Sequence, residues 1–422
     1  MGEEGGETEE KEGETKAHTP SQTPPRPKGN PVRGLRDQII GTPPLARPTF
    51  APFLPLGFPL RPLPMSKILV ALSGGVDSAV AALLLKQQGH EVHAAYFRTW
   101  MNEEGLPFPG ECPWEDDVRN AQAVAAHLGL PFRIIDLVQD YRDTVVQYLV
   151  DGYRHGLTPN PDIICNREMK FGVFLRKALQ DGYDVIATGH YARRRANADG
   201  TFDLLEGLDP NKDQSYFLAL LRQEQLAKAI FPIGELLKPE VRQLAADAQL
   251  PNAERKDSQG ICFLGQVPVQ DFLERHIPDS PGPIVNAAGK EIGKHRGLHR
   301  FTLGQRKGIG LPSNTDHEYF VVVKKDFATN TLHVAFDKPD APWLYTDEAV
   351  ARDFTWLNQP VVGEQAILAR VRYRDKATAA RFIPQADGTV RLRFAETHRG
   401  LAPGQVLAVY RDRVLMGGGV FV

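Results

Sequence analysis

The chain has 422 residues, few cysteines, little net charge and no long apolar run. Three cysteines cannot support a disulfide-stapled scaffold, and they predict a protein of a reducing compartment such as the cytoplasm. A net charge of −2 excludes a uniformly basic nucleic-acid binder, so contact with nucleic acid would need local basic patches. No apolar run approaches the ~18 residues of a membrane span, and we expect no membrane partner.

The first 64 residues lack the apolar periodicity of a folded domain. Residues 1–16 are rich in Gly and Glu, and residues 20–64 are dense in proline, which removes backbone donors and interrupts helices and strands. We interpret residues 1–64 as a disordered extension or as the product of a wrongly assigned start codon. Their acidic beginning argues against a secretory signal and, less strongly, against an organellar transit peptide.

The rest of the chain begins with alternating strand and helix patterns. We expect buried strands at residues 68–72, 91–97, 132–137 and 184–188. Such alternation with short connections predicts an α/β fold with a doubly wound parallel sheet, whose ligands bind beyond the carboxyl ends of the strands. The loops that follow the first, second and fourth strands should therefore converge.

Three folded domains are expected. Residues 65–214 form the sheet domain, and residues 215–281, which are polar with helical periodicity, form a small central helical domain. Residues 282–422 contain short strand-like stretches separated by turn residues, a pattern typical of a β-barrel.

The segment 73–78 (SGGVDS) joins the first expected strand to a helix. Its glycines permit positive φ, and the unpaired N–H groups of a helix start bind phosphate oxygens. The serine hydroxyls can add donors, and Asp77 can hold a Mg²⁺ ion that bridges phosphates. Neither G-x-x-x-x-G-K-[ST] nor G-x-G-x-x-G occurs, which excludes a Walker A loop and a dinucleotide fingerprint. The segment predicts a phosphate site of another kind.

Two cysteines lie in segments suited to chemistry. Cys165 follows Asn160-Pro161-Asp162, where the prolines restrict the backbone and Asp162 is a candidate proton carrier. The alternative is an ordinary turn followed by a buried structural cysteine. Cys262 stands in a polar, glycine-flanked segment, which predicts an exposed thiol. Beside a phosphate loop, two functional thiols suggest sulfur transfer, in which one carries a persulfide and the other resolves it.

Six motifs together resemble a known family. They are SGGVDS, TPNPDIICNREMKF, ATGHYAR, KDQSYFL, DSQGICFLG and FTLGQRKGIG, in this order. From Met65 onward the chain is similar to the tRNA-specific 2-thiouridylases of the ATP pyrophosphatase superfamily. The resemblance implies ATP-dependent 2-thiolation of the wobble uridine (position 34) of tRNAs for Lys, Glu and Gln. It also implies that adenylation of the uracil C2 oxygen precedes sulfur transfer from a cysteine persulfide, with AMP and pyrophosphate as products.

The resemblance further implies individual roles. Cys165 would be the nucleophile, Cys262 the persulfide carrier and Asp162 the acid/base. The implied ATP-binding residues are Ala71, Leu72, Ser73, Gly74, Gly75, Val76, Asp77, Ser78, Arg98 and Gly189. The implied contacts to the target base are Asn160, Pro161 and Asp162, and those to the rest of the tRNA are Lys212, Asp213, Gln214, Arg372 and Tyr373. Arg98 departs from the family pattern, because this chain has F-R-T-W where a longer F-M-x-x-W run is usual.

Several alternatives stay open at this point. ATP and Mg²⁺ are the implied cofactors, and a cysteine desulfurase or relay protein is the implied sulfur donor. An iron–sulfur cluster on Cys165, Cys262 and a third ligand is a less favoured alternative to the persulfide, and Cys112 has no assigned role. Competing functions are a 4-thiouridine synthase, a ligase like GMP synthetase, and a tRNA-binding protein with an inactive nucleotide site. The two thiols must meet, so we expect residues 257–265 to move onto the active site when tRNA binds.

Overall fold

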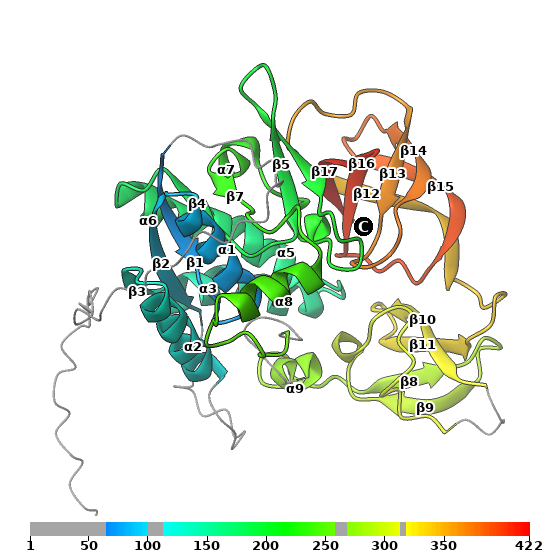
Figure 1. Ribbon diagram of the computed structural model, residues 1–422. Coiled ribbons are helices and arrows are strands. Elements are labelled where there is room, and N and C mark those ends of the chain that lie inside the picture. Colours follow the sequence, from blue (N-terminus) through cyan, green and yellow to red (C-terminus); the bar gives the residue numbers. More distant parts are fainter. Residues whose placement is uncertain (1–64, 100–112, 258–267, 313–317) are drawn as a thin grey trace, which may run out of the picture. The chain divides into compact units, whose positions relative to one another are not determined.

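The computed structural model describes residues 65–99, 113–257, 268–312 and 318–422. Its first sheet has five parallel strands in the order β3-β2-β1-β4-β7 (Figure 1). They are β1 (Lys67–Ala71), β2 (Glu91–Arg98), β3 (Phe132–Asp136), β4 (Val185–Ala187) and β7 (Ala229–Ile230). The predicted parallel α/β sheet is confirmed.

Helices cover both faces of this sheet. This is required because successive residues of β1 point to opposite faces and are buried on both. Ile68 and Val70 belong to one buried cluster with α1 (Val76–Gln87), α2 (Pro113–His127) and α8 (Lys238–Asp247). Leu69 and Ala71 belong to a second cluster on the opposite face. The helical segments of that second face are α3 (Val138–Tyr141), η1 (Arg142–Val146), α4 (Gln147–Arg154), α5 (Pro161–Ile164), η2 (Cys165–Phe174) and α6 (Leu175–Gln180). None of the helices in the described ranges is both long and apolar enough to cross a membrane.

The segment after residue 214 corrects one expectation. After η3 (Ser215–Leu218) and α7 (Gln223–Leu226), strand β7 pairs with β4, and Val241 and Ala245 of α8 join the buried cluster of α1. The first part of the expected helical domain, 215–281, therefore belongs to the sheet domain. A strand of two residues is too short to leave a periodic pattern, so the sequence shows only the surrounding helices. Helix α9 (Val269–Leu273) follows.

A small second sheet lies between this domain and the C-terminal strands in the sequence. Its order is β10-β11-β8-β9, around a core that includes Ile284, Val322 and Val334. The elements are β8 (Gly282–Val285), β9 (Glu291–His295), η4 (Leu298–Arg300), β10 (Phe320–Asp326) and β11 (Thr331–Phe336). From β10, the Lys325 ammonium donates to the carbonyl of Gly156, just after α4, at 2.8 Å.

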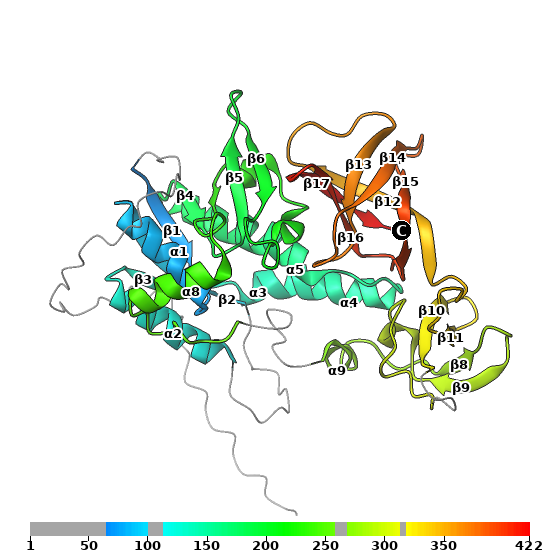
Figure 2. The same ribbon diagram turned by 45° about the vertical axis from the view of Figure 1, so that its right-hand side comes forward.

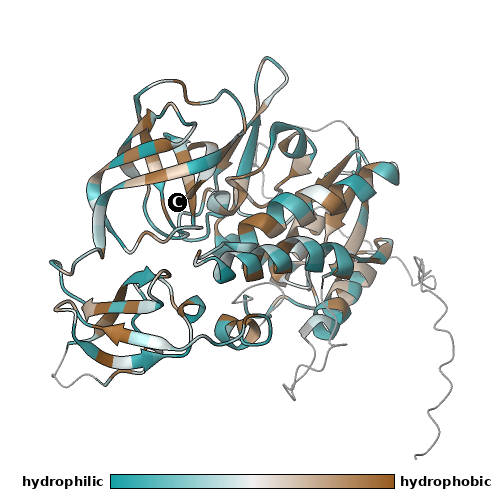
Figure 3. Ribbon diagram, turned by 180° about the vertical axis from the view of Figure 1, so that it is seen from behind, coloured by the Kyte–Doolittle hydropathy of each residue, from teal (hydrophilic) through white to brown (hydrophobic). Residues whose placement is uncertain are grey.

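The C-terminal strands form a closed six-stranded barrel (Figure 2), as predicted, because β12 pairs with β15 on one side and with β17 on the other. The strands are β12 (Tyr345–Trp356), β13 (Gln365–Arg370), β14 (Thr378–Pro384), β15 (Val390–Arg399), β16 (Val406–Arg411) and β17 (Val414–Phe421). Hydrophobic and hydrophilic residues alternate along barrel strands such as β14 and β15 (Figure 3), so one face of each lines the barrel core, whereas β16 is buried on both faces. The hairpin of β5 (Ala192–Ala196) and β6 (Phe202–Glu206) extends the barrel sheet through β17.

Candidate active site

The loop between β1 and α1 is shaped by its own serines. Gly74 has φ +79°, and Gly75 is extended at the start of α1. The Ser78 hydroxyl accepts a hydrogen bond from the Ser73 N–H at 3.2 Å and donates to the Gly75 carbonyl at 3.1 Å. This geometry turns the chain into the helix and directs the first-turn N–H groups to one side, as a phosphate site requires.

A second segment supports the loop from outside. The Gly74 carbonyl accepts from Asn252 Nδ2 at 2.9 Å and from Arg255 Nη1 at 3.1 Å, while Arg255 also pairs with Asp117. A Cβ at Gly74 would lie 2.5 Å from the Asp117 carbonyl oxygen, so only glycine fits here. The contacts of Asn252 and Arg255 with this loop could not be predicted from the sequence, because neither residue stands in a recognisable phosphate motif.

Gly189, which follows β4, touches the same loop. A Cβ there would lie 2.6 Å from the Ser78 nitrogen and 2.7 Å from the Asp77 carbonyl carbon. The next residue, His190, packs against Phe171, and its ring forms a hydrogen bond with the Thr188 hydroxyl. Burial holds the pKa of His190 well below its usual range. The predicted convergence of these two loops is confirmed.

The third expected loop begins at Arg98, the last residue of β2. Its guanidinium pairs with Asp136 at 2.5 Å and lies over the Trp114 ring. The structure thus places Arg98 at the same carboxyl edge of the sheet. The role of Arg98 in ATP binding stays a prediction.

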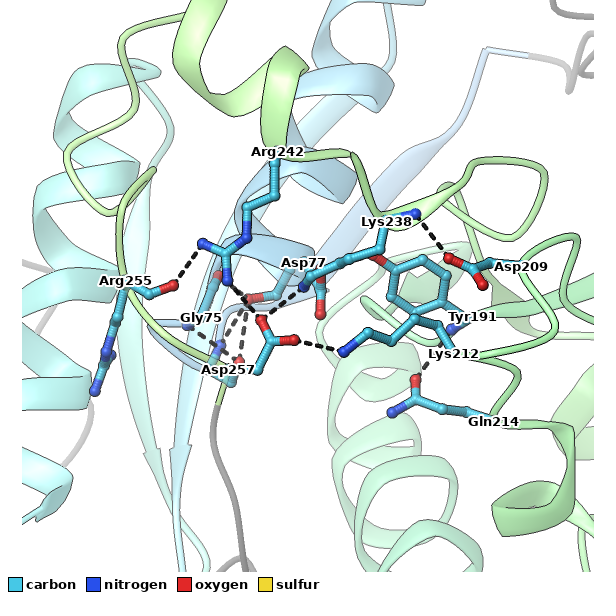
Figure 4. Close-up of polar contacts among 12 residues, drawn as sticks. Gly75, Asp77, Tyr191, Asp209, Lys212, Gln214, Lys238, Arg242, Arg255 and Asp257 are labelled. Carbon is cyan, nitrogen blue, oxygen red and sulfur yellow. Dashed lines mark hydrogen bonds and ion pairs between the residues drawn. The ribbon is translucent and has the colours of Figure 1, made fainter. Parts of the chain in front are cut away.

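Charged side chains gather beside the loop (Figure 4). Lys238, the first residue of α8, bridges Asp77 at 2.7 Å and Asp257 at 2.8 Å. Asp257 also pairs with Lys212 and Arg242. Burial would raise the pKa of Asp257, but the hydrogen bonds and charges of Lys212 and Lys238 outweigh it and lower the pKa to about 2. Among these cations, only Lys212 was predicted from the sequence.

Tyr191 completes this group. Its hydroxyl donates to Asp77 at 2.9 Å, and its backbone N–H donates to Gln214 Oε1 at 3.0 Å. Burial and the charge of Asp77 raise the pKa of Tyr191 above its usual range, so the phenol remains a neutral donor. The Gln214 side chain is therefore part of the scaffold of the loop.

The Asn160–Cys165 segment is firmly anchored. Asn160 Oδ1 accepts from the Ile163 N–H, which caps α5, and Pro161 occupies the first turn of that helix. Asp162 is half-buried, and Cys165, at the start of η2, is 2% exposed. A nucleophilic role therefore requires that this thiol become accessible. Cys112, Cys262 and residues 258–265 lie outside the described ranges.

The C-terminal barrel holds the start of this segment. The Thr158 N–H donates to the Pro403 carbonyl, and Gln405 Nε2 donates to the Thr158 carbonyl, both at 2.7 Å. A cavity of about 500 Å³ lies next to these contacts. It is lined by Gln270, Thr302, Leu303, Gly304, Gln305, Lys307, Arg372, Arg399, Gly400, Ala402 and Gln405.

The other predicted tRNA contacts occupy different settings. Arg372 lines the cavity, and Tyr373 packs on Phe217 with ring centroids 4.3 Å apart. Asp213 is buried, accepts from the Ser215 hydroxyl and pairs with Arg370 of the barrel at 2.6 Å. The position of Asp213 indicates that it joins the Lys212–Gln214 turn to the barrel, and not that it contacts tRNA at the surface.

The run Arg193–Arg195 is a basic patch in sequence only. Arg193 pairs with Glu235, Arg195 pairs with Asp203, and Arg194 donates to backbone carbonyls and lies over the Phe202 ring. These arginines stabilise the β5–β6 hairpin, so the patch offers few unengaged charges.

Comparisons with known protein families agree with this division of the chain into three parts. Three family profiles match in order: a tRNA methyl transferase HUP domain over residues 66–266, a tRNA methyl transferase PRC-barrel domain over 270–336, and an aminomethyltransferase beta-barrel domain over 346–421. The first match extends past β7 and α8, in agreement with their place in the sheet domain.

Two relatives decide the family. The tRNA-specific 2-thiouridylase MnmA of Akkermansia muciniphila is 53% identical over 85% of this chain and 99% of its own length. The protein of the same name from Leptothrix cholodnii is 44% identical over 85% of this chain and 96% of its own length. The chain belongs to the tRNA-specific 2-thiouridylase family. The predicted resemblance is confirmed.

A solved complex of a 4-thiouridine synthetase with RNA and ATP is 18% identical, covers 50% of each chain and gives a TM-score of 0.32. So distant a likeness adds nothing to the assignment. Three sites of this chain could therefore serve the activity of the 2-thiouridylase family. They are the phosphate loop, the Asn160–Cys165 segment and the cavity beside the barrel.

Proposed function

We propose that this protein uses ATP to replace the C2 oxygen of the wobble uridine, position 34, by sulfur in tRNAs for Lys, Glu and Gln. The observation that carries the proposal is the phosphate loop closed by Gly189, in a chain whose relatives are 2-thiouridylases over almost their full length. ATP binding follows from the loop, and tRNA as substrate follows from the family.

The loop supports the activation step. A carbonyl oxygen is a poor leaving group, and transfer of AMP to it makes a good one. Loop N–H groups and Lys238 can bind the pyrophosphate that departs. Among the described residues no three His, Cys, Asp or Glu side chains cluster as a metal site. A Mg²⁺ ion would fit with Asp77 as its carboxylate, and when bound it neutralises phosphate charge.

The sulfur step needs both cysteines. The outer sulfur of a Cys262 persulfide bonds to C2, either directly or after release as hydrosulfide, and AMP leaves with the former C2 oxygen. The Cys165 thiolate supplies the electron pair that cleaves the S–S bond of the persulfide, and a Cys165–Cys262 disulfide remains. Asp162, which precedes Cys165 by one helical turn, carries the proton in this scheme. An external thiol must then reduce the disulfide, and a cysteine desulfurase or relay protein must restore the persulfide.

The test is nucleoside mass spectrometry after incubation of the protein with ATP, a persulfide donor and bulk tRNA. We expect 2-thiouridine at position 34, dependent on ATP and on the donor. Sulfur at C4 instead would identify a 4-thiouridine synthase, and no thiolated product would indicate a binding protein. A Cys262→Ser protein that still makes 2-thiouridine would contradict the persulfide chemistry.

The cavity beside the barrel predicts a tRNA phosphate contact. Lys307 is exposed on its wall, so Lys307→Gln should weaken tRNA binding about 3-fold and reduce the salt slope of log K by about one. Lys294→Gln, which removes an exposed lysine of β9 in the small second sheet, is the control. Equal salt slopes for both variants, measured by filter binding between low and moderate salt, would exclude Lys307 as a phosphate contact.

A further inference from the structure

The Asp257 carboxylate forms ion pairs with three cationic side chains. Its carboxylate lies 2.7 Å from Lys212, 2.8 Å from Lys238 and 2.6 Å from Arg242 (Figure 4). Lys238 and Arg242 stand four residues apart on α8, so both reach the same side of that helix. Three charged donors on one carboxylate make an anion site that the protein fills itself.

This cation cluster adjoins the phosphate loop. The Lys238 ammonium contacts Asp77, in the first turn of α1, while it pairs with Asp257. Arg255, two residues before Asp257, donates to the Gly74 carbonyl at 3.1 Å. The cations therefore lie next to the loop in which we expect the phosphate chain to bind.

The cations of the cluster are paired with carboxylates without a ligand. Asp77 and Asp257 pair with the cations, and Asp209 accepts from the Lys238 backbone N–H at 2.9 Å. Two carboxylates thus pair with the side chains of Lys212, Lys238 and Arg242, whereas Asp209 contacts Lys238 through its backbone. With Asp257 in place a polyanion meets cations that are already paired, whereas withdrawal of Asp257 increases the unpaired positive charge next to the N–H groups of the loop.

We propose that Asp257 occupies, in the nucleotide-free protein, the position among Lys212, Lys238 and Arg242 that the pyrophosphate part of ATP takes on binding. The inference rests on the proposed function in that pyrophosphate is the leaving group. The cations exchange one carboxylate for phosphate oxygens, and Asp257 returns as pyrophosphate departs. Asp257 is thus an internal competitor that lowers the affinity for the product and promotes its release.

The exchange works by competition between anions and not by protonation. The hydrogen bonds and charges of Lys212 and Lys238 overcome the effect of burial and lower the pKa of Asp257 to about 2. A depressed carboxyl pKa means that the ion pairs persist at every pH above that value and weaken only as the pH falls through it. An incoming phosphate chain is then what displaces the carboxylate.

The test is calorimetric titration of full-length protein with magnesium pyrophosphate. Asp257→Asn should bind pyrophosphate about 3- to 10-fold more tightly than the unmodified protein, because the cations lose their internal partner. Asp247→Asn is the matched control, since it removes an exposed carboxylate from the end of the same helix and should leave the affinity unchanged. Lys212→Gln should weaken binding and should cancel the gain of Asp257→Asn when the two are combined.

Weaker or unchanged pyrophosphate binding by Asp257→Asn would overturn the inference, and so would an unchanged affinity of Lys212→Gln. The second variant decides the matter if the first does not fold. The titration needs neither tRNA nor a sulfur donor. A protein that binds pyrophosphate as expected but thiolates no uridine would therefore contradict the proposed function and leave this inference standing.

Discussion

Gly189→Ala should reduce ATP affinity and the rate of thiolation about 100-fold while the protein remains folded. The added methyl group would lie 2.6 Å from the Ser78 nitrogen and 2.7 Å from the Asp77 carbonyl carbon. Both atoms are backbone, so the methyl group cannot be accommodated by a side-chain rotation, and the loop itself must shift. A displacement of about 1 Å at a catalytic centre typically costs about 100-fold in rate.

Gly182→Ala is the control for this prediction. Gly182 lies in the turn after α6 in the same domain, and a Cβ there would meet no neighbouring atom of the described residues within 4 Å. Its φ of +79° makes alanine strained there, at a cost of about 1 kcal/mol in the free energy of unfolding. If both variants lose stability but only Gly189→Ala loses ATP binding, the effect belongs to the loop. Unchanged ATP affinity of Gly189→Ala, measured by equilibrium dialysis, would exclude this loop as the nucleotide site.

The sequence predicted the sheet and the phosphate loop because both depend on local patterns. A buried strand, two glycines and a helix start are adjacent in the chain, and the strand ends of a parallel sheet meet at one edge. The cation cluster could not be predicted in this way. Lys238 and Asp77 are 161 positions apart, and only the packing of α8 against α1 brings them together. Strand β7, with two residues, is too short to detect by periodicity.

Two further features depend on packing and not on a local sequence pattern. The Arg193–Arg195 run has the charge of a nucleic-acid patch, but Arg195 pairs within the β5–β6 hairpin, Arg193 pairs with Glu235 and Arg194 donates to Leu226 of α7. The sequence left open whether Cys165 is buried, because its burial depends on the packing of η2. Charge and polarity in sequence thus do not tell whether a side chain faces solvent.

The second large effect is expected at the ion pair between Asp213 and Arg370. Their side chains are 6% and 10% exposed and lie 2.6 Å apart, and Glu206 is the other partner of the arginine. Asp213→Asn removes one charge of a buried pair, which costs about 3 kcal/mol in the free energy of unfolding. Urea denaturation should show this loss, whereas Arg381→Met, at an exposed pair with Glu364, should change the midpoint little.

The same ion pair allows a test of the predicted role of Asp213 in tRNA binding. If Asp213 acts by holding the Lys212–Gln214 turn against the barrel, Arg370→Met should weaken tRNA binding as much as Asp213→Asn does. The double variant should then lose less than the sum of the two, since neither buried charge is left facing a missing partner. If Asp213 instead touches tRNA, only Asp213→Asn weakens binding and the two effects add. The buried position of Asp213, hydrogen-bonded to Ser215 and to Arg370, leads us to expect the first result.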